Sequence, residues 1–243
     1  MSHEINIVYY TFISPIKNYN LIIQGQLNDI INSNIGINSK LFIVISCEFP
    51  ELIDGVKNAI TEQLSNTNVN YELTIEPKNI FEYYGIKKVY DLAKVDPDKY
   101  YIYFHGKGMM NEHGEMTKTG RTKSNLSLTR SHLYPWEKIL DIFKSNQNIG
   151  IVSSYPASCW GWFNFWWASG NYLSTCEDPR VSLDNRGYYE VWLSTGICNG
   201  KPAIFNNELV YNLSENNHNH YEPLQAIAKM HETFPHLGEI YDI

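Results

Sequence analysis

The chain has 243 residues, of which 43% are hydrophobic, so it is long enough to bury a full core as one domain. Its formal net charge of -7 argues against broad binding to nucleic acid or anionic membranes, because both need a basic face. No run approaches the roughly 18 apolar residues of a spanning helix, and the N-terminus lacks a secretory pattern. We expect a soluble, cytoplasmic protein without an integral membrane segment.

Strands and helices alternate along the first hundred residues. Apolar, β-forming runs predict strands at residues 4–12, 40–46, 71–75 and 100–105. Amphipathic stretches between them predict helices at 20–32, at 51–64 with Pro50 beside its first turn, and from about 79 or 85 to 95. This alternation is typical of a parallel sheet wrapped by helices, and right-handed crossovers make it a Rossmann-like half.

The second half of the chain has a less regular pattern. Residues 109–131 are polar without strong periodicity, which favours a loop beside an active site. A helix is predicted at 134–145, a short strand at 148–153 and a final helix at about 223–233. Because no linker or repeat is visible, we expect one domain over residues 1–243, with a nucleotide-binding half to about residue 108 and an acceptor-side half from about 109.

The fourth predicted strand ends in YFHGKG, where His105, Gly106 and Lys107 follow a buried run. Ligands of open α/β sheets bind at such carboxyl ends, and glycines let the backbone approach a ligand closely. An imidazole and a lysine two residues apart could grip a diphosphate. The alternative is a strand-to-loop corner with a solvated lysine.

Aromatic residues are dense in WGWFNFWWASGNYL, residues 160–173. Core packing explains many of them, since large aromatics dominate cores. The segment has apolar groups on both faces, and the polar residues Asn164, Ser169 and Asn171 lie between them, which also suits a sugar-binding platform. We therefore expect at least one of the four tryptophans Trp160, Trp162, Trp166 and Trp167 to line a pocket, with Trp162, Trp166 and Trp167 as the candidates for the acceptor side.

Two further motifs carry titratable groups. Glu190 is flanked by aromatic residues, and such surroundings raise a carboxyl pKa toward the range of a general base. A salt bridge to Arg186 is the structural alternative. His218 and His220 form an HxH pair that could chelate a metal, although a solvated Asn-rich loop fits them better and no third ligand is evident.

Four stretches, in order, resemble a little-characterised group of glycosyltransferase-like proteins of the GT-A type found among viruses and microbes. They are FEYYGIKKVYDLAK, YFHGKGM, GWFNFWWASGNYL and YYEVWL, which span roughly residues 81–193. The resemblance implies an α/β fold with a mixed, mostly parallel sheet flanked by helices. It also implies a nucleotide-sugar donor at the carboxyl ends of the first half of the sheet and a glycan or other hydroxyl acceptor over the second. A viral member would act in the host cytoplasm.

The same resemblance implies roles for individual residues. Tyr10 and Thr11 would contact the nucleotide, and Gly85 with Lys88 would border the donor. Glu190 would take the late acidic position near the acceptor, as the candidate base of an inverting mechanism.

The sequence departs from the family at the metal motif. GT-A enzymes commonly place Asp-x-Asp after the fourth strand, where carboxylates hold a divalent metal such as manganese against the diphosphate. Here the matching residues are His105, Gly106 and Lys107, so the usual ligands are absent. Lys107, an imidazolium and Arg121 or Arg130 from the following loop could neutralise the diphosphate instead. We expect metal-independent glycosyl transfer, with a catalytically inactive glycan-binding or scaffold protein as the alternative.

Overall fold

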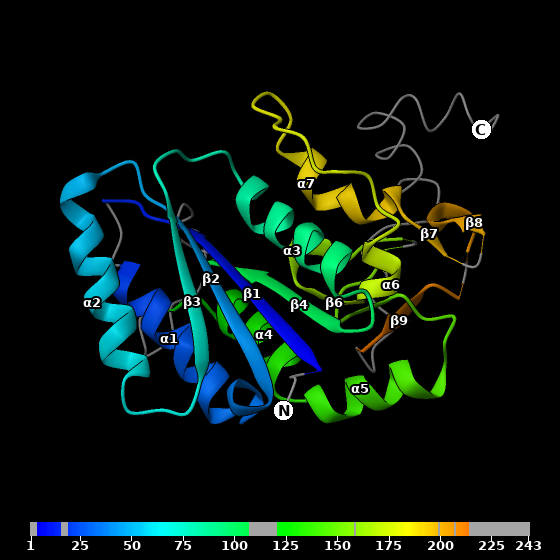
Figure 1. Cartoon of the computed structure of the whole chain (residues 1–243), viewed down its shortest axis with the longest axis horizontal. Coiled ribbons are helices and arrows are strands. Elements are labelled where there is room, and N and C mark those ends of the chain that lie inside the picture. The colour runs from blue at the N-terminus through cyan, green and yellow to red at the C-terminus, as the bar shows by residue number, and fades with distance from the viewer. Residues whose placement is uncertain are drawn as a thin grey trace.

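The computed structural model describes residues 4–15, 19–106, 121–157, 159–198, 200–206 and 208–213. A seven-stranded sheet in the order β3-β2-β1-β4-β6-β5-β9 forms its centre, and β7 and β8 pair separately (Figure 1). In chain order the elements are β1 (Ile5–Phe12), α1 (Tyr19–Asn32), β2 (Ser39–Ser46), α2 (Ile53–Leu64), β3 (Asn70–Glu76), α3 (Tyr83–Val95), β4 (Tyr100–His105), α4 (Lys123–Leu133), α5 (Trp136–Ser145), β5 (Ile151–Ser153), β6 (Trp166–Ser169), α6 (Gly170–Leu173), α7 (Gly187–Val191), β7 (Ile197–Cys198), β8 (Lys201–Pro202) and β9 (Val210–Asn212).

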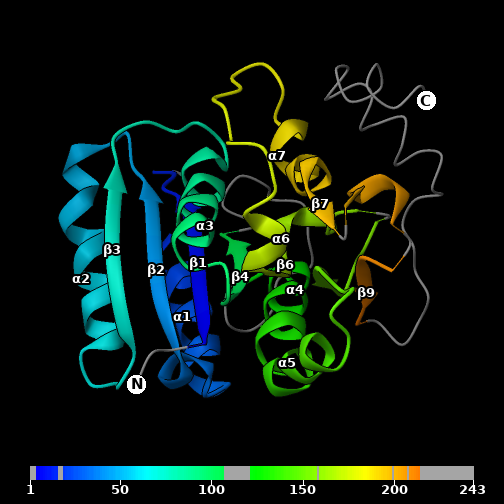
Figure 2. The same cartoon turned by 45° about the vertical axis from the view of Figure 1, so that its right-hand side comes forward.

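The strand order places a switch point in the middle of the sheet. Strands β1 to β4 are mutually parallel, and β6 runs against both β4 and β5. The chain steps outward from β1 to β3, and α3 then carries it back past β1 to β4. The carboxyl ends of β2 and β3 point to the top of Figure 2, the edge at which α7 also lies. We call this edge the carboxyl edge, and parallel sheets bind ligands there, at the switch point.

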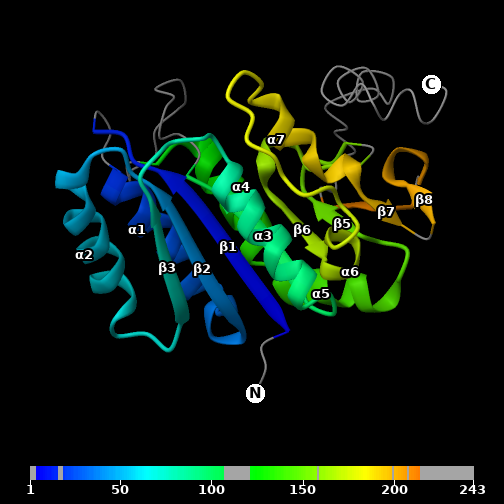
Figure 3. The same ribbon diagram turned by 45° about the horizontal axis from the view of Figure 1, so that its top comes forward.

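Helices cover both faces of the sheet, because side chains alternate along each strand. Val8 and Tyr10 pack on one face with α3, α6 and α7, which we call the α3 face. Ile7 and Tyr9 pack on the opposite α1 face with α1, α2, α4 and α5. Figure 3 shows α3 lying in front of the sheet, with α1 behind its strands. The expectation of an α/β protein with a mixed, mostly parallel sheet flanked by helices is confirmed.

Most predicted elements are present, with shifted ends. The helix predicted at 51–64 begins as a 3-10 turn, Pro50–Leu52, before α2 starts. The strand predicted at 148–153 is shorter, with β5 limited to Ile151–Ser153. None of the described helices has the length and apolar character needed to cross a membrane. The helix predicted at 223–233 lies outside the described residues.

The predicted loop at 109–131 is wrong over its last part, where α4 begins at Lys123. The Thr122 hydroxyl accepts a hydrogen bond from the backbone N–H of Asn125 at 3.1 Å, so the helix has a standard N-cap. Three of the side chains that α4 buries are polar, Asn125, Thr129 and His132, which is why hydrophobic periodicity did not indicate a helix. Residues 107–120 lie outside the described part of the chain.

Candidate functional site at the carboxyl edge

The ends of β1 and β4 approach each other closely at the switch point. His105 lies opposite Tyr10 in the register, and the N–H of Gly106 donates to the Tyr10 carbonyl at 2.8 Å. A Cβ atom at Gly106 would collide with the Thr11 hydroxyl, so this approach requires glycine. The predicted donor residues Tyr10, Thr11, His105 and Gly106 therefore lie together at the carboxyl edge.

The imidazole of His105 connects β4 to the 3-10 turn η3 (Trp162–Asn164). Its Nε2 lies 2.8 Å from the carbonyl oxygen of Phe163, which can only accept, so Nε2 carries the proton. The ring also packs against Phe165 with centroids 5.2 Å apart. His105 therefore fixes the segment that enters β6, in addition to facing the switch point.

Several buried polar atoms gather on the α3 face near this edge. The atoms Glu82 Oε2, Tyr103 OH, Trp160 Nε1, Trp166 Nε1 and both side-chain amide atoms of Asn164 have no hydrogen-bond partner among the described residues. We call these five residues the carboxyl-edge cluster. An unsatisfied buried polar group costs about 1–3 kcal/mol, so such a concentration calls for an explanation in terms of bound water or ligand.

The cluster is held together by contacts among α3, β4, β6, η3 and α7. The rings of Tyr103 and Trp166 lie 5.2 Å apart on adjacent strands. A Cβ atom at Gly85, in the first turn of α3, would lie 2.9 Å from the Tyr103 hydroxyl. The turn η3, which contains Asn164, contacts both β4 and α7.

Glu82 carries the buried carboxyl of this cluster. Its side chain is 7% exposed, and its Oε1 atom lies 3.5 Å from Nη2 of Arg186, whose side chain is 56% exposed. Burial raises the pKa of the Glu82 carboxyl, the Arg186 charge opposes that shift, and the nearby charge of Glu190 adds to it. The predicted base Glu190 therefore lies on α7 close to a second carboxyl that the sequence analysis did not identify.

Backbone strain surrounds the same region. Phe81, Phe163 and Asn164 have φ values of 46°, 66° and 54°, in the left-handed region that non-glycine residues seldom adopt. Phe81 precedes Glu82, and its ring lies 6.5 Å from that of Tyr189 on α7. Strained residues cost about 1–3 kcal/mol each and concentrate at functional sites.

Gly85 and Lys88, also predicted to border the donor, lie in different places. Gly85 lies at the carboxyl edge, packed against Tyr10 and Tyr103. Lys88 lies one turn further along α3, where its Nζ pairs with Glu72 of β3 at 2.8 Å and sits 4.8 Å from the centre of the Phe42 ring. Lys88 therefore covers the side of the sheet away from the switch point.

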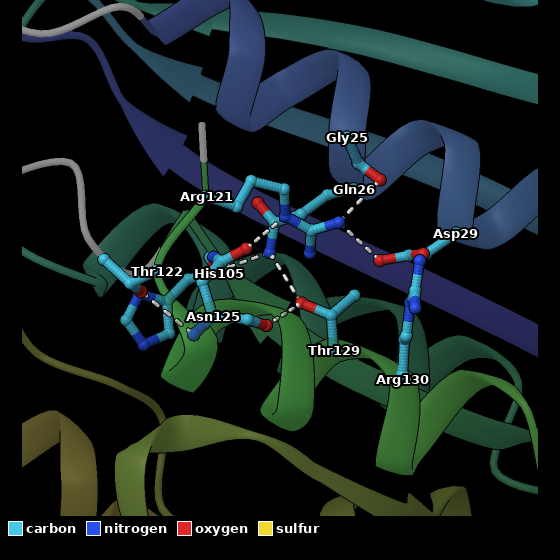
Figure 4. Close-up of polar contacts among 9 residues, drawn as sticks. All are labelled: Gly25, Gln26, Asp29, His105, Arg121, Thr122, Asn125, Thr129 and Arg130. Carbon is cyan, nitrogen blue, oxygen red and sulfur yellow. Dashed lines mark hydrogen bonds and ion pairs between the residues drawn. The ribbon is translucent and has the colours of Figure 1, made fainter. Parts of the chain in front are cut away.

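Arg121 and Arg130 join α4 to α1 (Figure 4). Nη1 of Arg121 lies 2.6 Å from one carboxylate oxygen of Asp29, and Nε of Arg130 lies 3.0 Å from the other. Arg121 also donates to the Asn125 side chain at 2.6 Å. Gln26 extends this network to the carboxyl edge by donating to the His105 carbonyl at 3.0 Å. Both guanidinium groups thus have an internal carboxylate partner. Arg130 lies about 10 Å along the axis of α4 from the start of the helix at Lys123.

The predicted acceptor residues do not form one platform. Trp162 and Trp166 pack on the α3 face, whereas Trp167 packs on the α1 face and donates its indole N–H to the His132 carbonyl at 2.8 Å. Asn171 is exposed on α6, beside Gly170, whose N–H donates to the Lys99 carbonyl near the amino end of β4. Only Trp162 and Trp166 share a face with the carboxyl-edge cluster.

Sequence reasoning did not identify Glu82 or Tyr103, and it noted Trp160 and Asn164 only as members of the aromatic segment 160–173. Glu82 could have been noticed as a carboxyl within the aromatic run FEYYG. Asn164, between Phe163 and Phe165, carried a similar signal as an amide among aromatic residues. Lys107, His218 and His220 lie outside the described residues, so their predicted roles stay predictions.

The end of β4 does not offer the carboxylate ligands of a typical divalent-metal site. Its potential metal ligand is the imidazole of His105, whose Nε2 already donates to the Phe163 carbonyl. Within the described ranges, no three His, Cys, Asp or Glu side chains are grouped so that they could hold a metal ion. Neither a protein-family model nor a curated protein matches this chain.

Proposed function

We propose that this protein is a GT-A-type glycosyltransferase that moves a sugar from a nucleotide-sugar donor to a glycan or other hydroxyl acceptor. The observation that carries the proposal is the carboxyl-edge cluster of buried polar groups beside the β1/β4 switch point. Open α/β sheets bind nucleotides at such a point, and hydroxyl-rich ligands supply the hydrogen bonds that buried polar groups need.

In this proposal Tyr10, Thr11 and Gly106 shape the nucleotide end of the site, and their tight packing lets the donor approach the backbone. Lys107, which follows directly, supplies positive charge to the diphosphate together with His105. The departing diphosphate takes the electron pair of the broken sugar C1–O bond, and the two side chains stabilise the resulting charge.

Glu190 acts as the base in the same step. Its carboxylate takes the proton of the acceptor hydroxyl while the acceptor oxygen forms the new bond to C1, on the face opposite the leaving group. Trp166 and Trp162 supply the aromatic surface beside this position. The products are the glycosylated acceptor, the nucleoside diphosphate and a protonated Glu190.

Calorimetry with UDP, GDP and their sugars tests the proposal. Lys107→Ala should weaken diphosphate binding at least about tenfold, since a charged hydrogen bond contributes about 1.5–3 kcal/mol. Lys40→Ala is the matched control, because Lys40 lies near the amino end of β2, where it pairs with Glu72 at 3.4 Å, and its loss should leave the affinity unchanged. Glu190→Gln should keep donor affinity and lose transfer. Equal affinity of wild type and Lys107→Ala would remove the assignment.

Metal dependence has its own measurement. Transfer should persist in EDTA if lysine and imidazole neutralise the diphosphate. Loss of transfer in EDTA with recovery in manganese would contradict the metal-independent part and leave the transferase proposal standing.

A non-catalytic glycan-binding protein is the second candidate. The engagement of Arg121 and Arg130 with Asp29 favours it, because these cations are then not offered to a diphosphate. Stabilisation against heat by oligosaccharide but not by any nucleotide sugar would support this candidate over the enzyme.

A further inference from the structure

We infer that the carboxyl-edge cluster is a subsite for an uncharged, hydroxyl-rich ring, which binds beneath α7. The inference rests on the proposed function, since it specifies how a sugar is held. It assigns the recognition of this ring to Glu82, Tyr103, Trp160, Asn164 and Trp166.

The chemistry of the cluster points to a neutral ligand with hydroxyl groups. The indole N–H groups of Trp160 and Trp166 can only donate, whereas Glu82 offers acceptor atoms when ionised. The Tyr103 hydroxyl and the Asn164 amide can do both. A cation would leave the indoles unsatisfied, and an anion would face the Glu82 carboxyl. A hydroxyl group both donates and accepts, so a polyol ring offers suitable partners to the donors and to the acceptors of this cluster.

The surrounding aromatic rings provide the apolar part of the same recognition. Tyr103 and Trp166 lie 5.2 Å apart and tilted by 31°, and Trp160 lies 5.4 Å from Trp162 in an edge-on arrangement. Aromatic faces pack against the C–H faces of a sugar, while its hydroxyls reach the polar atoms. Buried polar atoms interleaved with aromatic rings therefore match an amphipathic ring better than they match a purely polar ligand.

Access to the subsite requires α7 to move, because the polar atoms of the cluster are closed to solvent. Helix α7 contains only five residues. It is connected to the turn before α3 by the 3.5 Å pair between Arg186 and Glu82 and by the contact of Phe81 with Tyr189. The Arg186 side chain is more than half exposed, so when the pair separates its guanidinium can turn to solvent, while the buried Glu82 carboxyl is left to the ligand.

Two tyrosines of β4 provide a matched test. Tyr103 and Tyr101 lie on the same strand and face the same core, but the Tyr101 hydroxyl donates to the Asp96 carbonyl at 2.9 Å. Tyr103→Phe removes a hydroxyl without a partner in the described part of the chain, whereas Tyr101→Phe removes one that is bonded. Each variant deletes a single oxygen atom.

The experiment measures thermal unfolding and the binding of methyl glycosides of glucose, galactose, mannose and N-acetylglucosamine by calorimetry. Tyr103→Phe should keep or raise Tm and weaken binding of the preferred glycoside by about threefold to tenfold, which corresponds to one hydrogen bond. Tyr101→Phe should lower Tm and leave glycoside affinity unchanged. Glu82→Gln provides a second subsite variant of nearly equal size, with the same expected loss of affinity.

The outcomes separate this inference from the proposed function. Unchanged glycoside affinity in both Tyr103→Phe and Glu82→Gln would overturn the subsite. Failure of the wild-type protein to bind any of the glycosides would also overturn it, and bound water would then be the partner of the cluster. Glycoside binding that falls in these variants, with no binding of UDP or GDP, supports the subsite and overturns the nucleotide-dependent transferase.

Discussion

Two buried carboxyl groups on opposite faces of the sheet have very different partners. Asp29, on the α1 face, is paired through both oxygens, with Arg121 at 2.6 Å and Arg130 at 3.0 Å. Glu82, on the α3 face, has one pair at 3.5 Å, and its other oxygen lacks a partner among the described residues. Both side chains are nearly inaccessible to solvent, so burial does not distinguish them.

The two carboxyl groups differ in whether neighbouring residues pair with both of their oxygen atoms. A buried ion pair with satisfied hydrogen bonds fixes the elements it joins, here α1 and α4. An incompletely paired carboxyl beside strained backbone lowers stability and persists where function requires it. We therefore assign a structural role to the Asp29 network and a binding role to the surroundings of Glu82, and the following predictions test that division.

The largest effect is expected for Asp29→Asn, which removes the negative charge and leaves Arg121 buried. Breaking a buried pair in this way costs about 3–5 kcal/mol of unfolding free energy. Urea denaturation monitored by circular dichroism measures it. Glu4→Gln is the control, because Glu4 pairs with Lys144 at 3.0 Å with both side chains about half exposed. The control should change stability by less than about 1 kcal/mol. Equal effects of the two variants would show that the Asp29 network does not hold α4 to α1.

The stability contributions of the two faces should depend on pH in opposite directions. Burial lowers the pKa of His132 on α4 from 6.5 to about 4. Between these values the unfolded chain binds a proton that the native state does not, so stability falls as the pH is lowered from about 6.5 to 4. The loss amounts to about 3 kcal/mol and should be absent in His132→Gln.

Glu82 should act with the opposite sign. Burial raises the pKa of its carboxyl above 4.5, so the native state binds the proton first and this group adds stability as the pH falls through the native pKa. Urea unfolding of wild type, His132→Gln and Glu82→Gln at a series of pH values separates the two contributions. If Glu82→Gln and wild type have the same pH profile, the Glu82 carboxyl is not desolvated as described.

Sequence alone predicted the first half of the sheet because its strands are continuous apolar runs separated by amphipathic helices. It failed at α4, since part of the buried side of this helix consists of Asn125 and Thr129 and hydrogen bonds replace apolar contacts there. Hydrophobic periodicity reflects buried apolar surface, so the sequence of a helix with a polar inner side resembles that of a loop.

The switch-point residues His105 and Gly106 could be predicted because they directly follow a buried strand. Glu82 stands out in the sequence only as a carboxyl among aromatic residues. Its burial and pairing could not be predicted, because they depend on Arg186, more than a hundred residues away, and on the left-handed turn at Phe81. The separation of Trp166 from Trp167 follows from the two-residue period of a strand, and it becomes predictable once β6 is known. Contacts distant in sequence therefore account for most of what was missed.

A smaller effect is expected at Gly85, which permits the close packing of α3 on β1 and β4. A Cβ atom there would lie 2.7 Å from the Tyr10 Cβ atom and 2.8 Å from the Tyr103 ring. Gly85→Ala should therefore destabilise by about 1–3 kcal/mol and weaken donor binding. Gly55→Ala in α2 meets only the Tyr19 hydroxyl at 3.2 Å and should stabilise by about 0.5–1 kcal/mol through helix propensity. Thermal unfolding that ranks the two variants in reverse order would contradict the packing argument.

The smallest expected effect compares two asparagines in the left-handed region. Asn34 is exposed near the amino edge with φ 59°, and Asn164 is buried in η3 with φ 54°. Glycine suits both conformations, so Asn34→Gly should stabilise by a few tenths of a kcal/mol. Asn164→Gly also removes amide atoms that have no partner in the described structure. It should therefore stabilise the fold more than Asn34→Gly does, by about 0.5–1 kcal/mol once the lost packing is subtracted. The same substitution should weaken glycoside binding. A gain in stability with unchanged glycoside affinity would show that the strain at Asn164 is not maintained for binding.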